Sequence, residues 1–167
     1  MASAKDEFLS TAVRFERDGF DFYTGAAAKA KGALAREVFE SLAQDELRHI
    51  GFLEALSAGE ATVQSENQAL AARLRPIFKE ASEAVRQAAE AADTDIAALN
   101  LGIEREEASV QAYTEGAATA GSVELRELCK LLVGVETAHR LLLENVVEYL
   151  EHPDSFFLRE ERWIVEG

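Results

Sequence analysis

Two Glu-x-x-His motifs are the residues of this sequence best suited to do chemistry. They are Glu46–His49 and Glu136–His139, and 90 residues separate them. The chain has three histidines, so two of the three follow a glutamate at this spacing. Residues three apart on a helix share one face, so both side chains of a motif can reach the same ion. Carboxylates and imidazoles in this pattern predict a metal site.

The surroundings of the two motifs are also repeated. Glu16 lies 30 residues before the first motif, and Glu106 lies 30 residues before the second. Tyr23 and Tyr113 each follow the upstream glutamate by seven residues. This internal duplication predicts two copies of a unit made of a helix, a tight turn and a second helix.

Apolar residues at a spacing of three and four predict four amphipathic helices, and the candidate ligands interrupt the apolar stripe of each. The expected helices cover about 5–30, 34–57, 94–120 and the residues after Gly121, with Ser122 as N-cap. The candidate ligands therefore face the core. Four buried carboxylates need compensating charge, and two divalent cations would supply it.

Composition limits the protein class. The 167 residues suffice for one domain, and the net charge of −14 argues against nucleic acid or an anionic membrane as partner. No apolar run reaches the ~20 residues of a membrane span, and no signal peptide is evident, so we expect a cytoplasmic protein. The single cysteine, Cys129, excludes an internal disulfide and is expected to be a buried apolar residue.

Two segments lie outside the repeat. The connection 58–93 is too long for a turn, and its part from Ala69 to Ala92 has helical spacing, so we expect a crossover along the bundle. The tail 152–167 is expected to pack on the bundle or on a partner subunit. His152 has no glutamate three residues before it, which favours a surface position.

These residues resemble the ferritin-like di-iron carboxylate superfamily, in particular rubrerythrin-type domains without the rubredoxin module. The resemblance covers the whole chain and implies an all-α fold, a four-helix bundle with a long crossover between its second and third helices. It also implies two bridging glutamates, two terminal glutamates and one histidine for each of two irons. The bridging glutamates would be Glu46 and Glu136, and the terminal glutamates would be Glu16 and Glu106. The histidines would be His49 and His139.

The chain departs from the rubrerythrin pattern on the third helix. Rubrerythrins have a second glutamate three residues after the ligand there, where this chain has Ser109. Glu104 and Glu107 are also three residues apart, so a shifted register in which this pair faces the site is an alternative. The apolar stripe favours Glu106 as the ligand. Iron is expected because the site is rich in carboxylates and has no thiolate, with manganese or zinc as alternatives.

Three functions fit the resemblance. The first is an oxidoreductase that reduces hydrogen peroxide or dioxygen and is re-reduced by a separate electron-donor protein. The second is ferrous iron oxidation for storage or detoxification, and the third is a metal-stabilised interaction module without turnover. Tyr23 and Tyr113 would hydrogen-bond the ligand carboxylates, relay a proton or an electron, or pack as core tyrosines. Phe8, Phe15 and Phe22 form a second stripe, which a partner subunit or the crossover helix would cover, and we favour a homodimer.

Overall fold

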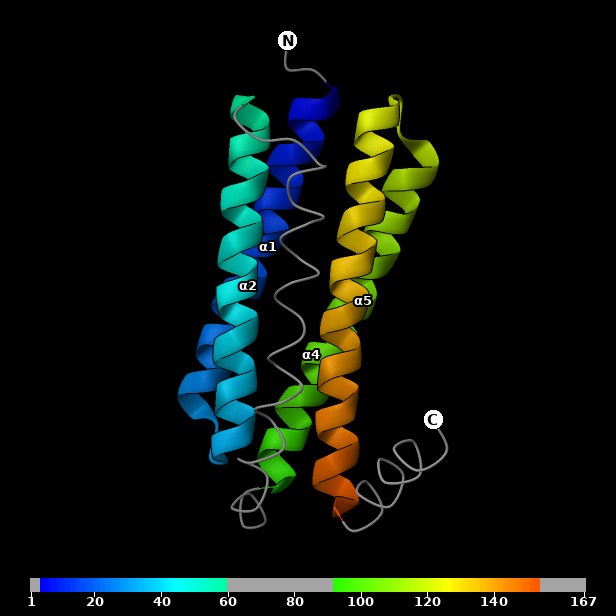
Figure 1. Ribbon diagram of the computed structural model, residues 1–167. Helices are drawn as coiled ribbons and strands as arrows, with labels where there is room; N and C mark the ends of the chain where they lie inside the picture. The colour runs from blue at the N-terminus through cyan, green and yellow to red at the C-terminus, as the bar shows by residue number, and fades with distance from the viewer. Residues whose placement is uncertain (1–3, 60–91, 154–167) are drawn as a thin grey trace, which may run out of the picture.

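Four long α-helices make up the described part of the chain (Figure 1). The computed structural model describes residues 4–59 and 92–153. Its helices are α1 (Ala4–Lys29), α2 (Ala33–Ala58), α4 (Ala92–Thr119) and α5 (Val123–Glu151). The four helices expected from the sequence are confirmed, and every boundary that was predicted lies within two residues of the observed one. The expected extra helix of the crossover and the tail from residue 154 onward lie outside the described residues.

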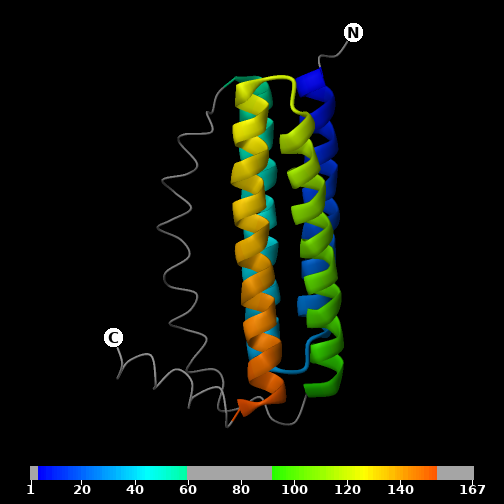
Figure 2. The ribbon, with the colours of Figure 1, turned by 90° about the vertical axis from the view of Figure 1, so that its right-hand side faces the viewer.

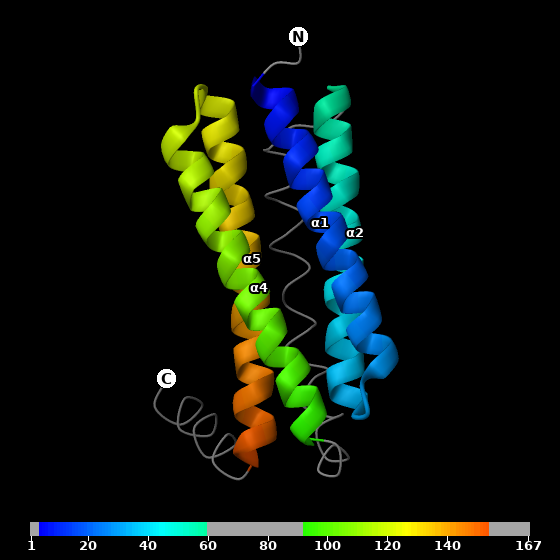
Figure 3. The ribbon, with the colours of Figure 1, turned by 180° about the vertical axis from the view of Figure 1, so that it is seen from behind.

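The helices form two antiparallel hairpins, α1 with α2 and α4 with α5 (Figures 1 and 2). Seen from behind, α1 and α4 face the viewer and α2 and α5 lie behind them (Figure 3). Helices α2 and α4 run in the same direction, so the end of α2 and the start of α4 lie at opposite ends of the bundle. The two copies of the repeated unit are therefore the two hairpins, and they face each other.

Local hydrogen bonds fix the helix ends. The Ser122 hydroxyl accepts a hydrogen bond from the Leu125 amide at 3.1 Å, which confirms Ser122 as the N-cap of α5. Gly59 ends α2 with a φ of 76°, a conformation that glycine adopts without steric cost. Asp95 of α4 accepts hydrogen bonds from the amides of Lys31 and Gly32, at 3.0 and 2.7 Å. Asp95 thus ties the start of the second hairpin to the turn of the first.

Two clusters of buried apolar side chains form the core, one toward each end of the bundle. The larger cluster, toward the α1–α2 turn, includes Tyr23, Phe39, Leu42, Leu99, Leu143 and Val146. The other cluster, toward the α4–α5 turn, includes Leu9, Leu53, Leu56, Tyr113, Leu128 and Leu132. The candidate ligands lie between the two clusters. Water therefore has little access to them along the bundle axis.

The phenylalanine stripe contacts residues of the same chain. The rings of Phe8 and Phe15 lie edge-on to Tyr113 of α4, each with a centroid distance of 6.4 Å. Phe22 lies edge-on to its neighbour Tyr23, at 5.1 Å. All three phenylalanines are half-buried. The packing within one chain accounts for part of this stripe, and the homodimer stays a prediction.

The outer faces of the helices are mainly polar. Large apolar side chains with high exposure in the described residues include Leu47, Leu101, Val123 and Leu141. Among the helices that the structure describes, none has the length and apolar character required to cross a membrane.

Candidate metal centre

All six candidate ligands point into the core near the middle of the four helices. Helices α1 and α4 contribute one glutamate each, and α2 and α5 contribute one Glu-x-x-His motif each. No member of the set is more than 5% exposed: Glu16, Glu46, His49, Glu106, Glu136 and His139. By contrast, Glu104 and Glu107 are exposed on the outer face of α4. The register that places Glu106 in the core is therefore the one that the structure adopts.

The six side chains fall into two overlapping groups. Glu46, Glu106, Glu136 and His139 each offer a ligand atom, and these atoms all lie within 4.8 Å of one another. A second group at the same spacing consists of Glu16, His49 and Glu136. Glu136 belongs to both groups, as a bridging ligand would. Glu46 belongs to the first, but its Oε2 lies only 3.8 Å from the Nδ1 atom of His49 in the second.

Several buried polar atoms of this cluster lack a hydrogen-bond partner. Among the described residues they include both carboxylate oxygens of Glu46, Oε2 of Glu106, Oε1 of Glu136 and Nδ1 of His139. An unpaired buried carboxylate oxygen carries a large desolvation cost. All of these atoms are metal-ligand types, and metal ions between the helices would satisfy them together. The residues present thus fit a pair of divalent cations.

Hydrogen bonding sets the charge state of one pair in the cluster. Burial alone would raise the pKa of Glu16, but hydrogen bonds with His49 and its other neighbours bring that pKa down to about 2. His49 Nδ1 lies 3.1 Å from Glu16 Oε2. Burial opposes the charged imidazole, yet the Glu16 and Glu46 carboxylates raise the pKa of His49 to about 10. Without metal, a proton on His49 takes the place of part of the missing positive charge.

Three further members of the cluster, Glu46, Glu136 and His139, favour their neutral forms. Burial, reinforced by the surrounding carboxylates, raises the pKa of Glu136 well above its usual value. Burial likewise raises the pKa of Glu46, with Glu16 adding to the effect. Burial lowers the pKa of His139, which leaves a neutral imidazole with a free lone pair. The metal-free cluster therefore binds protons where a metal-loaded cluster would bind cations.

Each tyrosine of the repeat hydrogen-bonds the glutamate of the opposite hairpin. The hydroxyl of Tyr23 donates to Glu106, and the hydroxyl of Tyr113 donates to Glu16. Burial and the adjacent carboxylates raise the pKa of both phenols above the usual value of 10, so both stay protonated. Of the roles considered for these tyrosines, the structure shows hydrogen bonding to the carboxylates and packing in the core, and the proton or electron relay stays a prediction.

A family model for rubrerythrin matches residues 7–147 of the chain. The chain belongs to the rubrerythrin family. The match spans all four described helices for most of their length, and this family is ferritin-like and di-iron. Comparison with curated proteins and with solved structures finds no match. The all-α, ferritin-like bundle expected from the sequence is therefore confirmed, and the buried clusters are consistent with a metal site in a rubrerythrin domain.

One feature of this rubrerythrin-family site was not predicted from the sequence. The guanidinium of Arg105 lies at the cluster, with Nη2 at 3.7 Å from Glu46 Oε1. The same nitrogen donates a hydrogen bond to the carbonyl oxygen of Phe15 at 3.0 Å, and the group lies over the Phe15 ring at 4.9 Å. Burial would lower the pKa of Arg105, but Glu46 and Glu106 raise it, so the side chain stays charged.

A glycine makes room for this arginine. A Cβ atom built at Gly19 of α1 would overlap the guanidinium of Arg105. Glycine inside a helix costs about 1 kcal/mol relative to alanine, so its presence at mid-helix indicates a packing reason. Gly19 was thus the signal in the sequence that could have pointed to a close approach from another helix.

Two further polar residues near the cluster were also missed. Asp45 of α2 is buried, lies 3.8 Å from His139 Nε2 and pairs with Arg48. Ser109, at the position of the family's additional glutamate, is buried and donates a hydrogen bond to the Arg105 carbonyl at 3.1 Å. The Ser109 hydroxyl is thus hydrogen-bonded within its own helix. The site has four glutamates where the family pattern has five.

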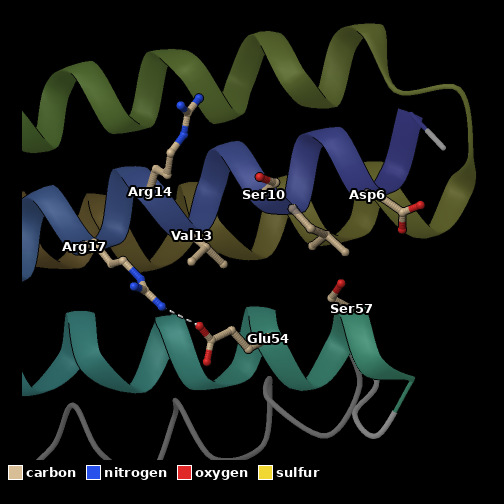
Figure 4. Close-up of a pocket in the computed structure, with 8 residues that line it drawn as sticks. Asp6, Ser10, Val13, Arg14, Arg17, Glu54 and Ser57 are labelled. Atoms are coloured by element: carbon tan, nitrogen blue, oxygen red, sulfur yellow. Dashed lines mark hydrogen bonds and ion pairs between the residues drawn. The ribbon is translucent and has the colours of Figure 1, made fainter. Parts of the chain in front are cut away.

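A groove on the outer side of α1 and α2 is separate from this cluster (Figure 4). It has a volume of about 250 Å³, and none of the six candidate ligands lines it. Arg17 and Glu54 form an ion pair of 2.8 Å between the two helices there. Both side chains are more than half exposed, so the pair contributes little to stability.

Proposed function

We propose that this protein is a rubrerythrin-type oxidoreductase that reduces hydrogen peroxide, or dioxygen, at a di-iron centre. The observation that carries the proposal is the buried cluster of four glutamates and two histidines with unpartnered oxygens. Carboxylate-rich sites without thiolate favour iron or manganese over zinc. When bound, a pair of ferrous ions supplies two electrons, which together with two protons convert one hydrogen peroxide into two waters.

The glutamates, histidines and tyrosines of the cluster would bind and orient the metal pair for this reaction. Glu136 and Glu46 would bridge the two metal positions, Glu16 and Glu106 would be terminal, and each position would have one histidine. Tyr23 and Tyr113 hold the terminal carboxylates from the opposite hairpin, which limits their movement. Burial and the adjacent carboxylates raise the pKa of both phenols, so each phenol in the metal-free protein keeps a hydrogen-bond donor on its carboxylate.

The apolar clusters above and below the site contribute by excluding water. They include Tyr23, Phe39 and Leu143 on one side and Leu9, Leu53 and Tyr113 on the other. In such a site the electrostatic effect of each fixed charge is larger than in water. We propose that a separate electron-donor protein re-reduces the centre.

A second candidate function is the oxidation of ferrous iron for storage or detoxification. The observation in its favour is the same buried Glu/His cluster, because a carboxylate-rich site of this kind can also bind ferrous iron as a substrate. In this case ferrous iron is the substrate and dioxygen the oxidant.

Stopped-flow oxidation of anaerobically iron-loaded protein separates these functions. The absorbance of the diferric product is followed after mixing with hydrogen peroxide or with dioxygen. We expect peroxide to react much faster, with further turnovers when a chemical reductant is present. Faster reaction with dioxygen, continuing beyond two irons per chain, would instead support iron oxidation. A loaded protein that reacts with neither oxidant would contradict both functions and leave a metal-stabilised module.

A further inference from the structure

The internal repeat of this chain is broken at the position of Arg105. The six candidate ligands and the two tyrosines obey the 90-residue offset, but Arg105 corresponds to Phe15, and Gly19 corresponds to Ser109. The guanidinium on α4 lies against Phe15, its own counterpart in the repeat, in the space that Gly19 of α1 provides. The pseudo-symmetric site thus carries one extra positive charge that has no counterpart in the first half of the repeat.

The guanidinium is held in place by contacts on three sides. Its Nη2 atom donates to the backbone of α1 at Phe15, its plane lies over the Phe15 ring, and Gly19 provides the space. Nothing in these contacts uses the Nε–H group, which is buried and lacks a hydrogen-bond partner. The side chain is only 14% exposed. A buried N–H donor without an acceptor from the protein leaves one hydrogen bond for a bound ligand or a water molecule to complete.

The charge balance of the site indicates whether that ligand is an anion or a cation. Four carboxylates neutralise two divalent cations, so Arg105 leaves the loaded centre with a net charge of about +1. Asp45, the other acidic side chain near the cluster, is compensated by its ion pair with Arg48. Ser109, at the position of the family's additional glutamate, adds no negative charge to the site. The excess charge lies near Glu46, whose Oε1 is 3.7 Å from the guanidinium.

We propose that Arg105 makes the metal-loaded centre a binding site for a small monoanion on the Glu46 side. The inference rests on the proposed function, since it requires the metal pair, and it names the class of ligand that this pair accepts. Hydroperoxide, the conjugate base of hydrogen peroxide, belongs to this class, and so does azide. Arg105 acts through its fixed positive charge and its free N–H donor.

The test is an azide titration of cobalt(II)-loaded protein at constant ionic strength. Cobalt(II) does not turn over with the substrate, and its visible absorbance changes when an anion binds. Removal of one charge from a partly desolvated site should weaken azide binding about tenfold or more in Arg105→Gln. Arg105→Lys keeps the charge and should recover most of the affinity. Arg17→Gln, which removes an exposed arginine from the outer groove, is the matched control and should bind azide like the wild type.

A second variant displaces the guanidinium without removing it. In Gly19→Ala the new methyl group occupies the space of the Arg105 head group, so azide binding should weaken although both arginine and ligands are present. Wild-type azide affinity in Arg105→Gln with two cobalt ions bound would overturn the proposal. If Arg105→Gln fails to fold or to bind cobalt, wild-type affinity in Gly19→Ala overturns it. A wild-type protein that binds no cobalt pair would instead contradict the proposed function.

Discussion

The hydroxyl of Tyr23 on α1 donates a hydrogen bond to the Glu106 carboxylate on α4. The repeat duplicates this contact, since Tyr113 on α4 donates to Glu16 on α1. The two hydrogen bonds cross between the hairpins at the level of the candidate ligands. Each hairpin thus holds a carboxylate of the other, and assembly of the site is linked to docking of the hairpins.

Removal of either phenol should loosen the metal site. In Tyr23→Phe and Tyr113→Phe, one ligand carboxylate loses its donor, and metal affinity should fall about 10-fold or more. The metal-free protein should lose about 1–3 kcal/mol of unfolding free energy, because each donor serves a buried carboxylate. Calorimetric titration with manganese(II) and denaturant unfolding measure the two effects. Tyr149→Phe, in the apolar cluster, controls for loss of a tyrosine hydroxyl, and equal affinities in all four proteins would contradict the prediction.

The stability of the metal-free protein should fall as the pH rises from 7 to 9.5. The pKa of His49 is raised from 6.5 to about 10 in the folded state, so its contribution is complete below pH 6.5 and lost toward pH 10. Burial also raises the pKa of Glu46 and of Glu136, whose contributions are lost in the same direction. The lowered pKa of Glu16, about 2, affects stability only in acid, and the lowered pKa of His139 only below about 6.5.

Thermal unfolding followed by circular dichroism tests this pH dependence. We expect the Tm of metal-free protein to drop by roughly 4 °C or more between pH 7 and 9.5. The manganese-loaded protein should show a smaller drop, because the metal replaces the protons. In His49→Gln the metal-free profile should be flatter. A Tm of metal-free protein that stays constant or rises over this range would count against the assigned charge states.

Asp95 should matter for stability although it is remote from the candidate ligands in the sequence and belongs to neither motif. Its carboxylate accepts from the Lys31 and Gly32 amides and is buried. In Asp95→Ala both amides lose this acceptor, and the unfolding free energy should fall by about 1–3 kcal/mol. Guanidinium unfolding of metal-free protein measures the loss. The exposed Asp21→Ala is the control, and an equal, small effect in both variants would show that Asp95 does not tie the hairpins together.

The helices and the candidate ligands were predictable because their signals are local or repeated. Ser122 caps α5 through an amide three residues away, and the apolar stripes continue over whole helices. The choice of Glu106 over Glu107 also followed from a stripe. The structure confirms that Glu106 is buried and Glu107 exposed.

The residues that were missed act over long separations in the sequence. Arg105 looks like one charge among several on an exposed helix face, and only the packing of α4 against Gly19 shows that it turns inward. Asp95 meets its partners 63 and 64 residues away. Neither contact has a spacing pattern that a single sequence could reveal.

Iron stoichiometry is the most direct test of whether these six residues hold two metal ions. Ferrous iron is titrated anaerobically into wild-type protein, Glu136→Ala and Glu107→Ala, and bound iron per chain is measured after desalting. We expect two irons per chain for the wild type and for Glu107→Ala, which changes an exposed neighbour of the site. We expect loss of the pair in Glu136→Ala, because Glu136 belongs to both ligand groups. Retention of two irons by Glu136→Ala would contradict the assignment of these residues as ligands of a metal pair.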